Sequence, residues 1–314
     1  MTRESSPAAA RVPVLLALVA VYVVWGSTYV GIRIALEGYP PFVMGAIRFL
    51  LAGAGMYGWL RARGVPAPSR REWGGSAVVG FLLLIVGNGG VAVAEQWVAS
   101  GLAAVMVASM PLWAALFAGF FGRWPRAVEW AGLAVGGAGV VMLNLDGDLR
   151  ASAPGAIALL LAPMCWALGS VWSSKLPLPK GQMASAAQML MAGAMFAVLA
   201  VPQLPRMGMP SLRATLALLF LTVFGSLVAY SAYQYLLRTV RPALATSYAY
   251  VNPVVALFLG VFLAGEHLAP AAAFGTSLVL LAVVMVAAYR NRAPSAIKPP
   301  LASNAPLAPR ADEG

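Results

Sequence analysis

The sequence predicts an all-α integral membrane protein with ten transmembrane helices, arranged as two inverted five-helix repeats. Three observations support this fold class. The 314 residues are 61% hydrophobic and only 10% charged, whereas a soluble domain carries about 25% charged residues. Apolar runs of about 20 residues, the length that crosses about 30 Å of hydrocarbon, recur along the chain. Segments of the first half also match segments of the second half at a nearly constant offset.

The apolar runs leave only short loops between them and no room for a soluble domain. We expect transmembrane helices at 13–35, 41–60, 74–95, 98–121, 128–145, 154–174, 181–201, 213–236, 243–264 and 268–289. The first run is long for a signal peptide and has no clear small-x-small cleavage site, so we expect a true helix there.

The net charge of +11 reflects membrane topology rather than a nucleic-acid partner. With an even number of spans both termini lie on one side, and most of the basic residues fall on that side. The other side holds four basic residues and five acidic ones: Arg33, Arg150, Arg206, Arg213, Glu37, Glu95, Asp146, Asp148 and Glu266. This is the positive-inside pattern. We therefore expect cytoplasmic tails at 1–12 and 290–314, the second disordered because Pro, Ala and Ser dominate it.

An internal repeat relates residues 13–145 to residues 154–289. The matched pairs are Pro13 with Pro154, Trp25 with Trp166, Arg48 with Gln188, and Pro111 with Pro253. Matches at nearly constant spacing indicate a duplicated five-helix unit. Because five is odd, the second unit must enter the membrane from the opposite side. Inverted repeats are typical of secondary transporters, whose substrate site lies between the halves near the midplane.

Arg48 interrupts the apolar run GAIRFLLAG in the second predicted helix. An arginine near mid-membrane costs about 2.5–3.5 kcal/mol on insertion scales and usually faces the bundle interior or a wet cavity. One interpretation is a structural arginine that caps carbonyls of neighbouring helices. The other is that Arg48 contributes positive potential to a substrate cavity, with Gln188 supplying polarity without charge in the other half.

Polar and aromatic side chains recur at helical spacing on several other spans. The candidate cavity residues of this kind are Tyr22, Trp25, Tyr29, Asn88, Glu95, Trp113, Trp166, Tyr230, Tyr233 and Gln234. Such stripes often serve packing, and Trp and Tyr near boundaries act as interfacial anchors. Several stripes in one bundle nevertheless favour a shared aromatic, weakly polar cavity.

Two prolines and a glycine pair predict local features of the helices. Pro111 and Pro253 lie inside predicted spans and free a backbone carbonyl one turn earlier, so we expect helix breaks, either simple kinks or markers of the binding region. Gly132 and Gly136 predict tight helix packing and leave open a homodimer face.

Residues for catalysis or metal binding are scarce. The sequence has no phosphate loop and no metal-ligand spacing, and Cys165 and the span-end His267 are the only residues of their types. We therefore expect no enzyme activity, no catalytic residue, no cofactor and no metal site.

Several stretches together resemble a known family: VVWGSTYVGIRIAL, GAIRFLLAG, GNGGVAVAEQWVASGLAAVMVASMPLWAALF and RPALATSYAYVNPVVALFLGVFLAGE. They resemble the EamA-domain members of the drug/metabolite transporter superfamily over about residues 13–289. The resemblance implies two inverted EamA repeats, a central cavity, and a place in the bacterial cytoplasmic (inner) membrane. It also implies efflux or exchange of small metabolites, often amino acids. The positions that match the family motifs are Trp25, Gly26, Ser27, Arg48, Asn88, Glu95, Pro111, Tyr248, Asn252 and Pro253, which adds Ser27, Tyr248 and Asn252 to the candidate cavity residues.

These observations favour a secondary transporter that exports a small metabolite or drug by alternating access, with membrane lipid as its surroundings. Proton coupling would need a titratable group in the path, and Glu95 is the best candidate. The alternatives are a passive facilitator or channel for small polar solutes, and a scaffold subunit that transports nothing.

Overall fold

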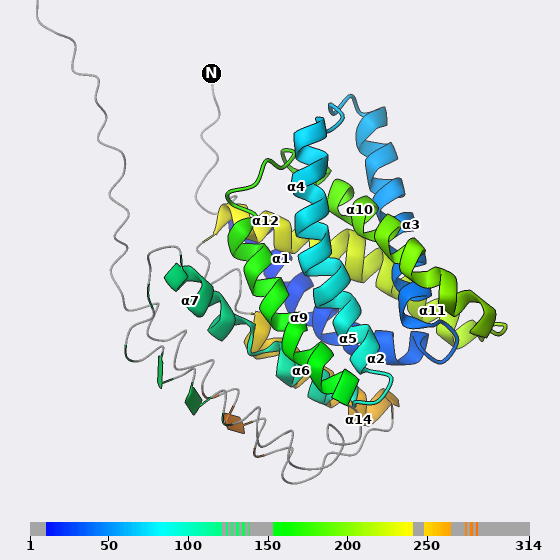
Figure 1. The fold of residues 1–314 in the computed structure, drawn as a ribbon, viewed down its shortest axis with the longest axis vertical. Coiled ribbons are helices and arrows are strands. Elements are labelled where there is room, and N and C mark those ends of the chain that lie inside the picture. The colour runs from blue at the N-terminus through cyan, green and yellow to red at the C-terminus, as the bar shows by residue number, and fades with distance from the viewer. Residues whose placement is uncertain are drawn as a thin grey trace, which may run out of the picture.

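The computed structural model describes residues 11–120, 153–240 and 248–264, with scattered positions between 124 and 138 and between 274 and 281. All regular elements within these ranges are helices (Figure 1). Seven helices there are long and apolar enough to cross a membrane: Val12–Ala35, Pro41–Ala62, Arg70–Ala94, Ser100–Phe117, Ala153–Trp172, Gln182–Pro205 and Leu212–Thr239. Most of the predicted spans at 128–145 and 268–289, most of the tail 1–12 and all of the tail 290–314 lie outside the described residues.

The first half of the chain builds its spans from α-helical and π-helical pieces. The elements are α1 (Arg11–Val19), π-helix η1 (Ala20–Val24), α2 (Trp25–Ala35), α3 (Pro41–Ala62), α4 (Arg70–Gly80), π-helix η2 (Phe81–Asn88), α5 (Gly89–Ala94), α6 (Ser100–Val107) and α7 (Met110–Phe120). The pieces α1, η1 and α2 form the continuous first span, and α4, η2 and α5 form the third.

The second half follows the same plan. The elements are α9 (Ala153–Trp172), α10 (Gln182–Ala200), 3₁₀-helix η3 (Val201–Arg206), α11 (Leu212–Phe220), π-helix η4 (Leu221–Tyr230), α12 (Ser231–Thr239) and α14 (Tyr248–Ala264). Under the sequence repeat, η4 lies at the position of η2, so the third span of each half carries a π-helical segment.

Local signals in the sequence set several helix starts. Pro41 is the first residue of α3, where its missing N–H is not needed. Ser69 and Glu72 form a capping box at the start of α4, with the Ser69 N–H 2.7 Å from the Glu72 carboxylate. Ser211 caps α11 by accepting from the Ala214 N–H at 3.1 Å. These side chains satisfy N–H groups that a helix leaves unpaired at its start.

The span predicted as one helix at 98–121 is divided in the structure. The chain turns at Ala108 and Ser109, between α6 and α7, and Pro111 is the second residue of the new helix. The Ser109 hydroxyl donates to the Met106 carbonyl at 2.7 Å. At the matched position of the second half, α14 continues from Tyr248 through Pro253 to Ala264. A proline removes one hydrogen bond of a helix, and α14 continues past Pro253 without a turn like the one at Ala108 and Ser109.

Helices α3 and α10, which match under the sequence repeat, cross in close contact (Figure 1). A Cβ atom built on Gly53 would lie 2.8 Å from the Leu190 amide nitrogen, and one on Gly193 would lie 2.7 Å from that of Leu50. Gly53 and Gly193 are equivalent in the repeat, as are Leu50 and Leu190, so the contact is reciprocal. Along this contact the residue number rises on one helix as it falls on the other, from Leu50 opposite Gly193 to Gly53 opposite Leu190. The equivalent helices therefore run antiparallel, as an inverted repeat requires.

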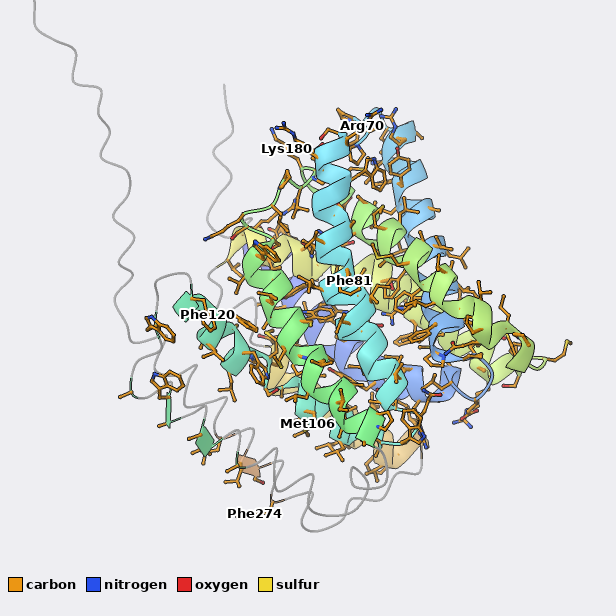
Figure 2. All side chains as sticks on the ribbon, viewed as in Figure 1. Arg70, Phe81, Met106, Phe120, Lys180 and Phe274 are labelled. Atoms are coloured by element: carbon orange, nitrogen blue, oxygen red, sulfur yellow. The ribbon has the colours of Figure 1, made fainter. Side chains whose placement is uncertain are left out.

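The two halves interlock rather than forming separate bundles. The same packing occurs twice with the halves exchanged: α2 packs on α14 and α9 on α6 and α7, while α3 packs on η4 and α10 on η2. Figure 2 shows Arg70 and Lys180 at one end of the bundle, which we call the Arg70 end. The loop 36–40 lies at the other end of α3, which we call the Glu37 end.

Candidate functional site

A small cavity lies where α2, η2, α5, α6, α9 and α14 meet. Its volume is about 50 Å³, which holds a few water molecules but is far below the roughly 300–1,000 Å³ of a typical small-molecule site. The lining residues are Trp25, Thr28, Tyr29, Ile32, Gly87, Asn88, Val91, Val107, Ala162, Trp166, Tyr248 and Asn252. The cavity is therefore aromatic with three neutral polar side chains, and it must widen to admit a metabolite.

An aromatic cluster joins the two halves beside this cavity. The rings of Trp25 and Trp166, matched residues of the repeat, meet edge to face with their centroids 5.5 Å apart. The Trp25 ring lies 5.0 Å from that of Tyr233 and 5.1 Å from that of Tyr248. Its indole N–H donates to the Gly225 carbonyl at 3.2 Å. The tryptophan pair thus lies on the interface that any relative movement of the halves would change.

Arg48 is buried beside the cavity, with 2% of its surface exposed. Its Nε donates to Ser226 Oγ at 2.7 Å and its Nη1 to Asn88 Oδ1 at 3.2 Å. Its guanidinium carbon also lies 4.9 Å from the centre of the Phe49 ring. Within the described residues Arg48 forms no ion pair. Neutral groups alone therefore hold this charge.

Arg48 connects the two π-helical segments. Asn88 is the last residue of η2 and Ser226 lies in η4, so one side chain of α3 bridges matched elements of opposite halves. Room for the guanidinium comes from Gly225, where an added Cβ would lie 2.9 Å from Arg48 Nη2. π-Helical segments occur frequently at functional sites, which makes this junction the centre of the candidate site.

Gln188 takes the position of Arg48 in the other half, in a separate buried cluster. Its Oε1 accepts from the Tyr230 hydroxyl at 2.5 Å and from Gln234 Nε2 at 3.2 Å. All three side chains are at most 5% exposed. The matched positions therefore differ in charge, and only the Arg48 side reaches the cavity through its partner Asn88.

The Asn252 amide fastens α14 to the first span. In the amide orientation that satisfies both of its ends, its nitrogen lies 3.2 Å from the carbonyl oxygens of Tyr248 and Val21 and 3.1 Å from that of Tyr22. Val21 and Tyr22 belong to η1. The asparagine thus supports a π-helical segment from across the halves.

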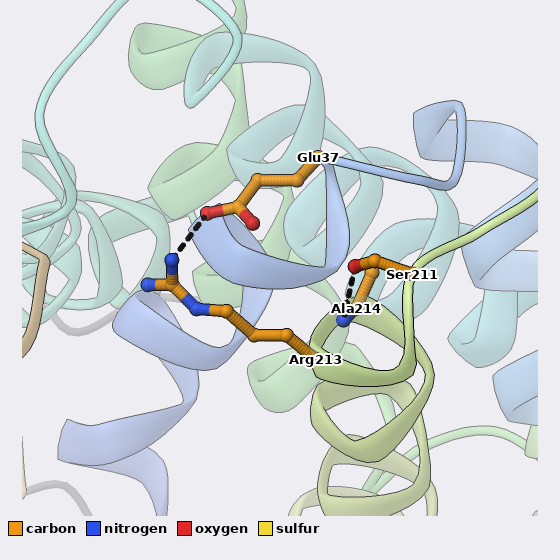
Figure 3. A network of polar contacts seen from close by, with 4 residues as sticks. All are labelled: Glu37, Ser211, Arg213 and Ala214. Carbon is orange, nitrogen blue, oxygen red and sulfur yellow. Dashed lines mark hydrogen bonds and ion pairs between the residues drawn. The ribbon is translucent and has the colours of Figure 1, made fainter.

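A polar pocket of about 420 Å³ lies at the Glu37 end, lined by Arg33, Ile34, Leu36, Glu37, Glu95, Gln96 and Arg213. Glu95 is fully buried, and the Arg33 guanidinium donates to its backbone carbonyl. Figure 3 shows the ion pair between Glu37 and Arg213, 3.4 Å long, which joins the first half to the start of α11. Tyr39 adds a 3.1 Å hydrogen bond to Thr215. These contacts link the two halves at the Glu37 end.

The ion pair in this pocket should add little to stability. Its two side chains are 57% and 46% exposed, and exposed pairs typically contribute about 0–1 kcal/mol. We expect Glu37→Gln to lower the free energy of unfolding by less than about 1 kcal/mol. Thermal unfolding of the purified variant in detergent measures this. A loss of several kcal/mol would show that the pair, rather than the surrounding packing, holds the two halves together at this end.

The predicted site residues divide into groups in the structure. Trp25, Tyr29, Asn88, Trp166, Tyr248 and Asn252 line the cavity, with Arg48 and Tyr233 directly behind it. Gln188, Tyr230 and Gln234 form their own cluster. Four residues are placed away from the cavity: Glu95 in the polar pocket, Trp113 stacked on Phe117, Tyr22 with its carbonyl bound by Asn252, and Ser27 in a groove with α11 and α14.

Two polar residues of the site were not among the predicted set. Thr28 lines the cavity one helical turn after Trp25, and this spacing could have revealed it. Ser226 holds Arg48. It shares a stripe at helical spacing with Tyr230, Tyr233 and Gln234, and this spacing was the signal for it in the sequence.

Comparison with known proteins identifies the family. The model of the EamA-like transporter family matches residues 12–145 and again 153–288, so the chain belongs to this family and carries its domain twice. The inner membrane transporter YedA of Escherichia coli is 46% identical over 276 residues, which cover 87% of this chain and 90% of that protein.

More distant matches also cover most of this chain. The "Probable terminal-alkyne amino-acid exporter" of Streptantibioticus cattleyicolor is 25% identical over 281 residues, 86% of this chain and 92% of that protein. A solved structure titled "Crystal structure of protein" aligns with a TM-score of 0.65 at 21% identity, over 90% of this chain and 99% of that one. This likeness supports the fold alone.

Proposed function

We propose that this chain is a secondary transporter of the bacterial inner membrane that exports a small metabolite, an amino acid or a related compound, by alternating access. The observation that carries the proposal is the antiparallel contact of α3 with α10, beside a cavity lined by both halves. Exchanging the conformations of two equivalent, oppositely oriented halves gives two states of similar energy that face opposite sides. The names of the relatives support a transporter, and one of them supports amino acids.

The small cavity favours a carrier over a passive pore. A pore needs an open path, whereas this cavity has a volume of only about 50 Å³. Counterflow in proteoliposomes tests the proposal: unlabelled amino acid loaded inside accelerates the uptake of labelled amino acid through a carrier. Uptake without such stimulation would indicate a facilitator or channel instead. The absence of any uptake, for every amino acid tested, would remove this substrate class.

The proposed topology places both termini and the Arg70 end in the cytoplasm. Arg61, Arg63, Arg70, Lys175 and Lys180 all belong to loops or helix ends at that end, in agreement with the positive-inside rule. Reporter fusions at the two termini measure this directly. Reporters on opposite sides of the membrane would contradict ten spans in two inverted units.

Proton coupling is assigned to Glu95. Among the acidic side chains that the structure describes it is the buried one, whereas Glu37 is exposed and Glu72 is only partly buried. We expect a pH gradient to stimulate wild-type uptake, and Glu95→Gln to remove this stimulation while counterflow persists, because exchange needs no proton. Glu37→Gln, a matched change in the same pocket, should keep the stimulation. Wild-type uptake that is independent of the pH gradient would leave exchange or uniport as the mechanism.

A further inference from the structure

We infer that Asn88 and the pair Asn252 and Thr28 recognise two different groups of the substrate, a carboxylate and an ammonium group respectively. The inference rests on the proposed function and assigns the polar contacts of its cavity. It follows from counting which hydrogen-bonding groups the protein already uses and which remain available to a ligand.

The oxygen of the Asn88 side chain is already engaged. Arginine has donors and no acceptor, so the Asn88 atom that faces Arg48 Nη1 at 3.2 Å must be the oxygen. Asn88 makes no other side-chain hydrogen bond to the described residues and lines the cavity. Its NH₂ is the side-chain group that has no partner among the described residues, and this donor suits a carboxylate or carbonyl oxygen. Arg48 positions this donor and is not itself a lining residue.

The charge of Arg48 decides between an anionic and a cationic group near Asn88. An aromatic cavity alone would also suit a quaternary ammonium ion. However, Arg48 is 2% exposed and has no acidic partner among the described residues, and charges interact strongly where the dielectric constant is low. A carboxylate bound at Asn88 lowers the energy of this isolated guanidinium, whereas a cation there raises it.

Asn252 and Thr28 offer the opposite polarity. The Asn252 nitrogen is shared among three backbone carbonyls, so the group that this side chain can offer a ligand is its oxygen, an acceptor with two lone pairs. The Thr28 hydroxyl donates to the Trp25 carbonyl at 2.7 Å, so its oxygen can only accept from a further partner. Both residues line the same cavity as Asn88. Two acceptors suit an ammonium or amide N–H group.

The two polarities together define the ligand class. An α-amino acid carries a carboxylate for Asn88 and an ammonium group for Asn252 and Thr28, and its side chain would contact the rings of Trp25 and Trp166. Compounds that have only a cationic group lack the first contact, and simple carboxylic acids lack the second.

Ligand binding by two near-isosteric variants tests the assignment. Asn88→Asp replaces the donor by an oxygen and keeps an acceptor for Arg48, so folding should persist. Thr28→Val removes the acceptor and breaks only a bond within its own helix. The probes are the 20 proteinogenic L-amino acids, screened by thermal shift on the purified full chain, and then the strongest stabiliser, its des-amino acid and choline, measured by calorimetry. Gln182→Glu, an amide-to-acid change at an exposed position of α10, is the matched control.

We expect Asn88→Asp to weaken both the amino acid and the des-amino acid by roughly tenfold or more, as for a lost hydrogen bond to a charged group. Thr28→Val should weaken the amino acid several-fold and leave the des-amino acid unchanged, and Gln182→Glu should change neither. Unaltered binding by Asn88→Asp, tighter binding of choline than of any amino acid, or no wild-type binding of any amino acid would overturn the inference. If the wild type binds amino acids as expected but shows no counterflow, the proposed carrier function is wrong and the ligand assignment stands. If the wild type shows counterflow and Asn88→Asp leaves it unchanged, the carrier function stands and the ligand assignment is wrong.

Discussion

Replacing Arg48 by leucine should abolish transport while leaving a folded protein in the membrane. The variant loses the link between Asn88 and Ser226, and with it the support of the NH₂ donor in the cavity. Folding should survive because two effects oppose each other. The buried Ser226 and the partly buried Asn88 each lose a partner, at about 1–3 kcal/mol for a buried group, and the insertion cost of an arginine, about 2.5–3.5 kcal/mol, disappears.

The measurement is counterflow in proteoliposomes at equal protein density, with size-exclusion profiles to verify folding. Arg48→Lys should retain part of the activity, because a lysine keeps the charge without the planar fork that reaches two partners. Arg61→Leu, at an exposed position of the same helix, controls for the loss of a basic residue and should transport normally. Wild-type transport by Arg48→Leu would show that the arginine is structural.

The second large effect is expected at the crossing of α3 and α10. Leucine at Gly53 or Gly193 would force its Cβ to within 2.8 or 2.7 Å of a backbone nitrogen, so the two helices must separate. Overpacking of a well-packed contact typically costs about 1–3 kcal/mol, and backbone atoms can relieve it less than a flexible side chain can. We expect aggregation or a large fall in melting temperature for each variant.

Gly55 provides the control for this experiment. It lies on the same helix as Gly53, and a Cβ there would meet nothing within 4 Å. Gly55→Leu should be neutral or slightly stabilising, because leucine has the higher helix propensity. Equal melting temperatures for Gly53→Leu and Gly55→Leu would mean that the close crossing is not a determinant of stability.

The sequence predicted those parts of the fold that depend on hydropathy and on the repeat. Apolar runs located the described spans, and the Trp25–Trp166 match anticipated two residues that meet in the structure. The isolated charge of Arg48 pointed to the interior, where the structure places it. Each of these predictions depends on the chemical type of the side chains, which can be read directly from the sequence.

The faces of the helices were harder to predict, because they depend on backbone detail. The prediction that Tyr22, Trp25 and Tyr29 share one face of the first helix requires an uninterrupted α-helix. The structure instead has a wider π-helical turn, η1, at Ala20–Val24. This changes the phase between residues before and after it, and Tyr22 is not a cavity residue while Trp25 and Tyr29 are. Neighbouring residues of a helix are rotated by about 100° about its axis. Thr28 therefore lines the cavity, while Ser27, one position earlier, lines the groove with α11 and α14.

The difference between Arg48 and Gln188 has a consequence for how such a molecule can be built. A lone half that paired with an identical copy would bury two guanidinium groups across its axis, and each would add its own insertion penalty. When the two halves are joined in one chain, their matched positions can differ. The first half keeps the Arg48 cation, and the second half has the Gln188 amide, whose oxygen accepts hydrogen bonds from Tyr230 and Gln234. The loss of exact symmetry within one polypeptide thereby leaves a single buried positive charge, on the Asn88 side of the interface.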